Sequence, residues 1–289
     1  AIREQPGLDG WLFYDFRHLH PIAYRVLLLD PSLHVTRRWY YWVPAQGTPV
    51  KLQHRIEPHV LDGLPGDAHA YVSWRDQQAA LGSLLHSAKR IAMQYSPMNA
   101  IPYLSRVDAG TIDLVRSLGA EVVTSADLVQ QFEAVWDDAQ LASHQVAAEG
   151  LRAIVDEAFG FVGTSLAARS SLTEYGLQQY ILSRMQARGL VTSSPPIAAV
   201  NAHSADPHYA PASEGSAPIR PGDLVLIDLW AKQPGPGAVY ADITWTGFVG
   251  ATVPARHQDI FQIVRRARDA AVTFVQGRVR AGECPYGWE

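Results

Sequence analysis

The sequence predicts two domains, an α/β domain over residues 1–137 and an α+β domain over residues 138–289. Three observations support this division. Strand-like and helical segments alternate in the first half, as they do in a sheet covered by helices. A long helical stretch then crosses the boundary, which we place near Asp137. The second half holds two strand-like segments, joined by a Pro/Gly-rich turn, that each contain one Asp.

Short runs of apolar, β-branched and aromatic residues, bounded by turn residues, predict the strands of the first domain. Two helices are expected between them, over residues 76–86 and 109–118, and Gly119 ends the second. Basic and aromatic residues meet at 37–42, as on a surface that stacks nucleic-acid bases, but in an acidic chain we favour a strand with an aromatic core face. The predicted strands are residues 10–14, 24–29, 38–43, 50–54, 70–74, 90–94 and 121–123.

Composition and charge argue against several classes of function. The 289-residue chain has a net charge of −4, which gives no electrostatic reason to bind nucleic acid or an anionic membrane. No apolar run approaches the roughly 18 residues that a membrane span needs. The one cysteine, Cys284, cannot form an intrachain disulfide, which fits a reducing cytosol. We therefore expect a cytoplasmic protein with no nucleic-acid or membrane partner.

Periodic apolar residues predict the helices of the second domain. The helical stretch over residues 126–161 leads into it, another helix is expected from Thr173 to Gly189, and a third over residues 255–275. The last helix has an apolar stripe, and its arginines are expected to face solvent. The stripe comprises Ile260, Ile263, Val264, Ala267, Ala271 and Phe274, and the arginines are Arg265, Arg266 and Arg268.

The strand pair over residues 222–230 and 240–246 carries Asp228 and Asp242. Asp228 stands within an apolar run, where an unpaired carboxylate is costly. Two facing carboxylates also repel each other unless a cation or a shared proton lies between them. Either one Asp is a cap and the other lies on the surface, or both bind a divalent metal. Oxygen ligands suit ions such as Mn²⁺ or Mg²⁺, and we favour the metal site.

The order of these residues resembles the pita-bread metallopeptidases, a group that includes methionine aminopeptidase, aminopeptidase P, prolidase and the metal-free creatinase. The resemblance implies an α/β N-terminal creatinase-like domain followed by an α+β pita-bread catalytic domain. The residues that carry it are Asn201-Ala-His203-Ser-Ala-Asp-Pro-His208-Tyr209, then Gly222-Asp223, Ile227-Asp228-Leu229 and Asp242-Ile243-Thr244.

The resemblance also assigns roles to particular residues. It implies that Asp228 and Asp242 are the first two of five metal ligands, and that His208 lines the site near the scissile peptide. Tyr209 and His203 are further candidates for substrate binding, and His203 competes with His208 for the catalytic role.

The sequence departs from the family pattern in several places. The gap between the two Asp residues is a few residues wider than usual, Trp230 replaces a small residue, and Trp245 stands where the family often has Arg. The remaining ligands, one His and two Glu, and the Glu that accepts a proton would lie beyond residue 289. We therefore expect a fragment that lacks the C-terminal half of the catalytic domain, and residues 282–289 resemble a turn that enters another element.

The activity implied by the resemblance is hydrolysis of Xaa-Pro peptide bonds at a dinuclear metal site, with manganese expected and cobalt or zinc as alternatives. The partner would be a peptide or dipeptide with proline at its second position, and the family suggests a homodimer. An α/β domain precedes the catalytic domain in aminopeptidase P, prolidase and creatinase but not in methionine aminopeptidase, which favours proline-directed substrates.

Other classes of function remain open. One is a non-catalytic pita-bread module that binds peptides or proteins, and another is a lyase or amidinohydrolase reaction on the same fold. The sequence does not separate a dipeptidase from an aminopeptidase.

Overall fold

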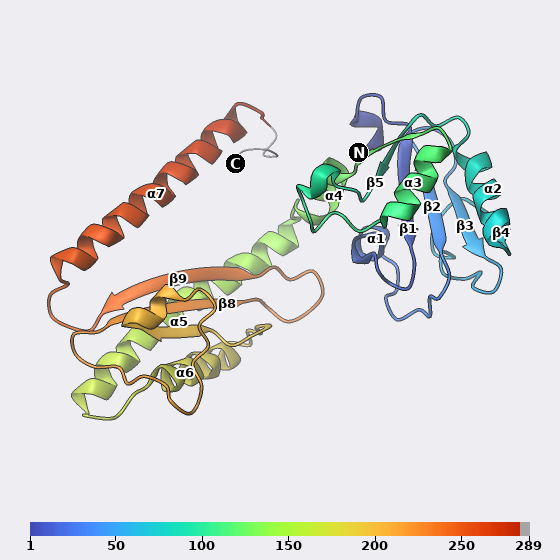
Figure 1. Cartoon of the computed structure of the whole chain (residues 1–289). Helices are drawn as coiled ribbons and strands as arrows, with labels where there is room; N and C mark the ends of the chain where they lie inside the picture. The colour runs from blue at the N-terminus through green and yellow to red at the C-terminus, as the bar shows by residue number, and fades with distance from the viewer. Residues whose placement is uncertain (284–289) are drawn as a thin grey trace. The chain divides into compact units, whose positions relative to one another are not determined.

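The computed structural model describes residues 1–283 and divides the chain into two compact units, Ala1–Trp136 and a second unit that begins at Asp137 (Figure 1). Cys284 and the rest of the predicted closing turn lie outside the described residues. Across residues 1–283, no helix combines the length and apolar character that a membrane crossing requires.

The first unit is built on a six-stranded mixed sheet in the order β4-β3-β2-β1-β5-β6. β1 pairs antiparallel with β2 on one side and parallel with β5 on the other, which makes the sheet mixed. The pairs β3–β4 and β5–β6 are also parallel. The strands are β1 (Gly10–Asp15), β2 (Trp39–Pro44), β3 (Val50–His54), β4 (Asp67–Tyr71), β5 (Arg90–Met93) and β6 (Glu121–Thr124).

Helices cover both faces of this sheet, as the alternation of elements predicts. One core lies between the sheet and helices α2 (Trp74–Leu85) and α3 (Ala109–Ser117). The other lies beneath α1 (Pro21–Leu27) and α4 (Ala126–Glu133). Successive aromatic residues of β2 alternate between the two cores, so the interpretation of residues 37–42 as a strand with a buried aromatic face is confirmed. Two short 3-10 helices, η1 (Ile2–Glu4) and η2 (Pro97–Asn99), complete the unit.

The strand predicted over residues 24–29 is wrong, because this segment belongs to helix α1. Pro21 occupies the first turn, and the His20 ring caps the helix by accepting a hydrogen bond from the Ala23 amide at 3.1 Å. The strand predicted over residues 70–74 is displaced: β4 ends at Tyr71, and Ser73 forms a capping box with Asp76 that starts α2.

The second unit begins where Asp137 caps the long helix α5 (Asp138–Ala167) through a capping box with Gln140. The helical stretch predicted over residues 126–161 is therefore two helices with a break at 134–137. Helix α6 (Glu174–Ala187) follows, and three antiparallel strands form a sheet in the order β7-β8-β9. The remaining elements are β7 (Ile197–Val200), η3 (Asn201–Ala205), β8 (Leu224–Ala231), β9 (Ala241–Phe248) and α7 (Ala255–Arg280).

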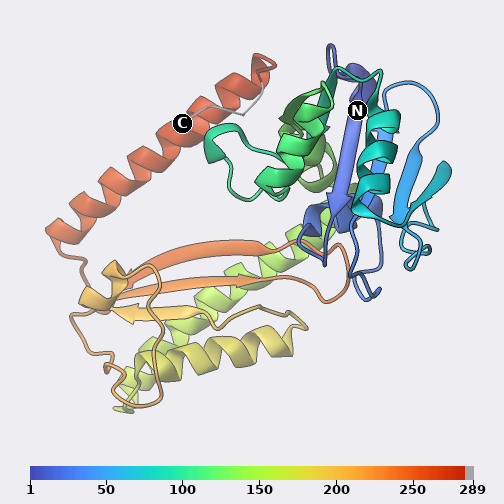
Figure 2. The same cartoon turned by 45° about the vertical axis from the view of Figure 1, so that its right-hand side comes forward.

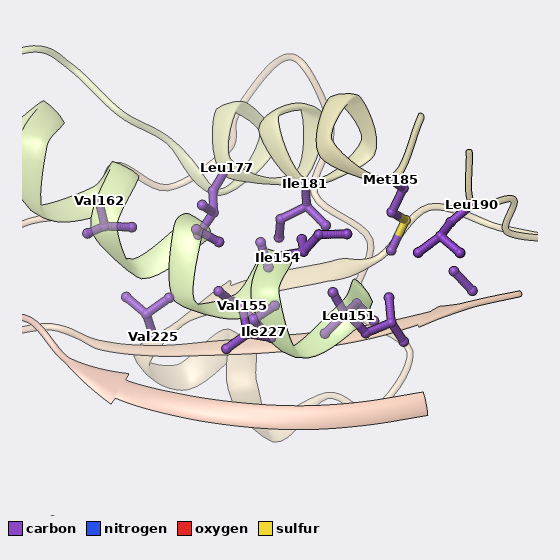
Figure 3. Close-up of a cluster of buried hydrophobic side chains, with 14 of the residues drawn as sticks. Leu151, Ile154, Val155, Val162, Leu177, Ile181, Met185, Leu190, Val225 and Ile227 are labelled. Atoms are coloured by element: carbon purple, nitrogen blue, oxygen red, sulfur yellow. The ribbon is translucent and has the colours of Figure 1, made fainter. Parts of the chain in front are cut away.

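Helices α5 and α6 pack on one face of this sheet (Figures 1 and 2). Side chains of α5 lie between α6 and the strands and form the core of the unit (Figure 3). Leu151, Ile154 and Leu177 are fully buried there, together with Ile227 and Leu229 of β8. Burial of these side chains holds the hairpin β8–β9 on the helices, and the opposite face of the hairpin takes no part in this core.

Helix α7 has the predicted apolar stripe, but none of its residues is buried within the described part of the chain. Ile260 and Val264 are 52% and 62% exposed. The arginines at 265, 266 and 268 are exposed as predicted.

Replacing Gly247 with Ala is expected to destabilise the second unit by about 1–3 kcal/mol, because the new methyl group overpacks the core. A Cβ at this position would lie 2.4 Å from the ring of Phe159 on α5. Gly163→Ala is the matched control, since its Cβ would meet nothing within 4 Å and Ala favours a helix. Thermal unfolding measures both, and equal stability of Gly247→Ala and the wild type would contradict the packing of β9 on α5.

Candidate metal centre

Asp228 and Asp242 lie on the same face of the β8–β9 hairpin. The register places Asp228 opposite Thr244, and Trp230 opposite Asp242. Because residues two apart on a strand share a face, all four side chains project to one side. The two carboxylates are diagonal neighbours on that side, so both face the same region of space above the sheet.

This face is the one that does not pack on the helices. Burial along β8 alternates strictly: Val225, Ile227, Leu229 and Ala231 are buried, and the residues between them are only half-buried. The apolar run around Asp228 therefore does not place its carboxylate in the core, because β8 is buried on one face only. The strand is apolar on both faces, and Asp228 avoids the core by projecting from the less buried one.

The two carboxylates differ in their surroundings. The Thr244 hydroxyl donates a hydrogen bond to Asp228 Oδ1 at 2.6 Å. No donor contacts the Asp242 carboxylate among the described residues. Partial desolvation and then the negative charge of Asp228 raise the pKa of Asp242 above its ordinary value. A divalent cation placed between the two groups would remove that repulsion.

The donor set fits part of a metal site. Carboxylate oxygens are the ligands of hard divalent cations, and here two of them project from rigid, hydrogen-bonded strands. Within residues 1–283, however, no group of three or more His, Cys, Asp or Glu side chains is placed to hold a metal ion. The described residues therefore supply two ligands and not a closed coordination sphere.

His203 and Tyr209 form a second cluster, around the buried carboxylate of Glu174. His203 Nδ1 lies 2.8 Å from Glu174 Oε1, and the Tyr209 hydroxyl donates to Oε2 at 2.5 Å. The two rings stack with centroids 4.5 Å apart. Desolvation, together with the hydrogen bond to Glu174 and its charge, raises the pKa of Tyr209 to about 12.

His208 lies next to this cluster and is exposed. Its backbone amide donates to Asp206 Oδ1 at 2.9 Å, and within the described residues its ring makes no hydrogen bond. The loop of His208 leaves the sheet at Val200, which pairs with Val225, about 10 Å along β8 from Asp228. The structure thus brings Asp228 and Asp242 together, and His203 and Tyr209 together, as two separate clusters.

Sequence reasoning did not find Glu174, and it named Asn201 and Asp223 only as part of the motif, without their structural role. The Asn201 side chain donates to Asp223 Oδ1 at 2.7 Å and accepts from the Leu224 amide at 2.9 Å, which joins the end of β7 to the start of β8. The Gly-Asp pair at 222–223 therefore serves to hold the strands. The only local signal for Glu174 is its place directly after the capping Thr173.

Trp245 lies on the helix-packed side of the hairpin. The guanidinium of Arg152, from α5, stands over its ring at 4.2 Å from the centroid. The aromatic residue at this position thus contacts the helix and does not face Asp228 or Asp242.

Comparisons with known proteins identify relatives of the second unit and of the whole fold. Residues 139–285 match the profile of Peptidase_M24, metallopeptidase family M24. No curated protein matches the chain.

Solved structures with the same fold include three peptidases. Dipeptidase PepE from Mycobacterium ulcerans is 22% identical with a TM-score of 0.56, and the match covers 89% of this chain and 64% of that one. A prolidase from Thermococcus sibiricus is 19% identical (TM-score 0.52; 94% and 69% covered). The X-prolyl aminopeptidase of Caenorhabditis elegans, described as a cytosolic enzyme with a di-nuclear active site, is 18% identical (TM-score 0.52; 88% and 40%). The chain thus spans 64% of PepE and less than half of the C. elegans enzyme.

Proposed function

The chain belongs to metallopeptidase family M24, and on that premise we propose that it is part of a metal-dependent peptidase that hydrolyses Xaa-Pro peptide bonds. The observation that carries the proposal is the placement of Asp228 and Asp242 on one face of a hairpin that lies inside the matched residues 139–285. Two carboxylates in this arrangement can bind a metal ion, and without a bound cation they lower the stability of the fold through their mutual repulsion and desolvation.

The substrate class is proposed from the structural relatives. They are a dipeptidase, a prolidase and an X-prolyl aminopeptidase, and at these identities they share the fold alone. Both Xaa-Pro dipeptides and longer peptides with proline second are therefore proposed substrates. A dinuclear site with manganese is proposed, with cobalt or zinc as alternatives, in a cytoplasmic homodimer.

The domain assignment is part of the same proposal. Residues 1–137 would form a creatinase-like N-terminal domain, and residues 138–289 the first part of a pita-bread catalytic domain. The six-stranded sheet with helices on both faces supports the first assignment, and the match to the family supports the second. The other ligands and the residue that accepts a proton would come from a part of the protein beyond residue 289.

In this mechanism Asp228 and Asp242 would hold the metal through their carboxylate oxygens. Divalent metal ions bound in this way supply an activated water and polarise a carbonyl group. Thr244 fixes the orientation of Asp228 through its hydroxyl hydrogen bond. His208, whose ring is exposed, would donate a hydrogen bond to the substrate or to the oxyanion that forms on the scissile carbonyl. Tyr209 and His203 would hold the loop that carries His208 in place.

A non-catalytic module that binds peptides is the second candidate function. The exposed apolar face of α7 would suit such a role. The pairing of Asp228 with Asp242 argues against it, because a binding module gains nothing from two adjacent carboxylates; desolvation and then the charge of Asp228 raise the pKa of Asp242.

The proposed function is tested with the full-length gene product, stripped of metal and then supplied with Mn²⁺. Release of the first residue is measured from a set of Xaa-Pro dipeptides and Xaa-Pro-Yaa tripeptides, beside matched peptides with Ala in place of Pro. Metal-dependent cleavage of the proline series supports the proposal, and the two lengths separate a dipeptidase from an aminopeptidase. A folded protein that cleaves none of them with Mn²⁺, Co²⁺ or Zn²⁺ would refute it.

Replacing His208 with Ala is expected to lower kcat by about 100-fold while bound metal stays at the wild-type level, because His208 acts on the substrate and holds no metal. Steady-state kinetics and metal analysis measure the two effects. His69→Ala is a matched control, since His69 is exposed on β4 in the first unit. Loss of metal in His208→Ala would instead make His208 a ligand.

A further inference from the structure

The buried side chain of Glu174 has a place in the fold that the proposed mechanism does not use. It is the first residue of α6, directly after the capping Thr173, and it is 0% exposed. A carboxylate at this point benefits from the positive end of the helix dipole. Full burial of an acidic group still requires donors for both of its oxygens.

Four donors meet the two oxygens. Oε1 accepts from the Val200 amide at 2.7 Å and lies 2.8 Å from His203 Nδ1. Oε2 accepts from the Tyr209 hydroxyl at 2.5 Å and from the Ala217 amide at 3.0 Å. Each oxygen thus holds one backbone amide and one side chain.

All four donors belong to one loop. Val200 is the last residue of β7 and Ala217 lies where the chain returns to α6, so the same carboxylate closes the loop at both ends. The Glu174 amide also donates to the Ala217 carbonyl at 3.0 Å. His203 and Tyr209 attach the interior of the loop to the same point. A loop of this length without such an anchor would carry a large conformational entropy.

We propose that Glu174 is the positioning residue of the candidate site: it fixes the loop over residues 200–217 and thereby sets where His208 meets the substrate. The inference rests on the proposed function of His208. His208 directly precedes Tyr209, whose hydroxyl and ring are both held, so the path of the backbone at His208 is set by the Glu174 cluster.

The same contacts separate the roles of the two histidines. A carboxylate only accepts hydrogen bonds, so His203 Nδ1 must donate to Glu174. One face of the His203 ring is covered by Tyr209. His203 is thereby a structural link of the loop, and His208 is the histidine left to contact a substrate.

Glu174→Gln is the decisive variant, because it keeps the shape of the side chain. It replaces one carboxylate oxygen, which accepts two hydrogen bonds, with an amide NH2 group that can only donate. Whichever oxygen is replaced, either the Val200 or the Ala217 amide loses its acceptor. Hydrogen exchange of the amide that loses its acceptor is expected to accelerate at least tenfold, and kcat/KM for an Xaa-Pro peptide to fall at least tenfold. Glu214→Gln, an exposed carboxylate of the same loop, is expected to change neither.

A double-mutant cycle distinguishes positioning from a general loss of structure. If Glu174 acts through His208, Glu174→Gln should cost less than twofold in kcat/KM when His208 is already Ala. Equal losses in both backgrounds would overturn the proposal. Tyr209→Phe, which removes one bond and leaves Glu174 intact, keeps the test available if Glu174→Gln does not fold, and its several-fold loss should likewise vanish in the His208→Ala background.

The exchange measurement needs no activity, so it separates this inference from the proposed function. A wild-type protein without peptidase activity would refute the proposed function, while slow exchange at Val200 and Ala217 that depends on Glu174 would still establish the anchor. Unchanged exchange in Glu174→Gln would overturn the anchor itself.

Discussion

Asp228→Asn is expected to lower kcat/KM for Xaa-Pro peptides by about a thousandfold or more and to reduce the bound metal. The amide keeps the size of the side chain and removes the charge that a divalent cation requires. A thousandfold loss corresponds to about 4 kcal/mol of transition-state stabilisation. Steady-state kinetics with saturating Mn²⁺ and metal analysis of the purified protein measure both quantities.

Three further variants make this result specific. Asp242→Asn should have an effect of the same order, since both carboxylates lie on one face of the hairpin. Thr244→Val removes only the hydrogen bond to Asp228 and should cost about tenfold or less. Glu214→Gln, an exposed carboxylate outside the hairpin, should behave as the wild type. Full metal content and activity in Asp228→Asn would refute the metal role of the hairpin.

Leu229→Ala is expected to destabilise the second unit by about 3 kcal/mol, the typical cost of a cavity left by a buried Leu. Leu229 is fully buried and lies between Asp228 and Trp230 in β8, on the face that packs on the helices. For a unit of this size the unfolding temperature should fall by roughly 6–12 °C. Calorimetry is the suitable method, because the two units can unfold in separate transitions.

Leu141→Ala in α5 is the matched control for this stability effect. The Leu141 side chain is 44% exposed, so its truncation leaves no comparable cavity, and the change in unfolding temperature should be small. If both variants unfold at the same temperature, Leu229 does not lie in the core between the sheet and helices α5 and α6.

The hairpin could be predicted because its signals are local. The Pro/Gly-rich turn between two β-rich segments fixes the pairing, and each strand carries its own Asp. The side of the sheet on which Asp228 lies could not be predicted, because Leu224, Leu226 and Trp230 make the second face of β8 as apolar as the first. The alternation appears only once the helices cover one face.

Other errors have the same origin. Residues 24–29 form an apolar run too short to separate strand from helix by periodicity, and the decisive signals, His20 and Pro21, lie just before it. Glu174 could not be predicted as an anchor, because its four donors are distributed between residues 200 and 217. The sequence of a helix alone does not indicate which residues of a distant loop will form hydrogen bonds with it.

The alternation along β8 also bears on how this fold can evolve. Odd-numbered positions from 225 to 231 hold the sheet to the helices, and the position of Asp228 contributes little to that core. Substitutions at the core-facing positions should therefore be selected through their effect on stability and so on protein abundance. Substitutions at the position of Asp228 should be selected through their effect on the chemistry of the site. A descendant that lost both carboxylates would keep its scaffold, so an enzyme and a non-enzymatic homologue can be separated by as few as two codons.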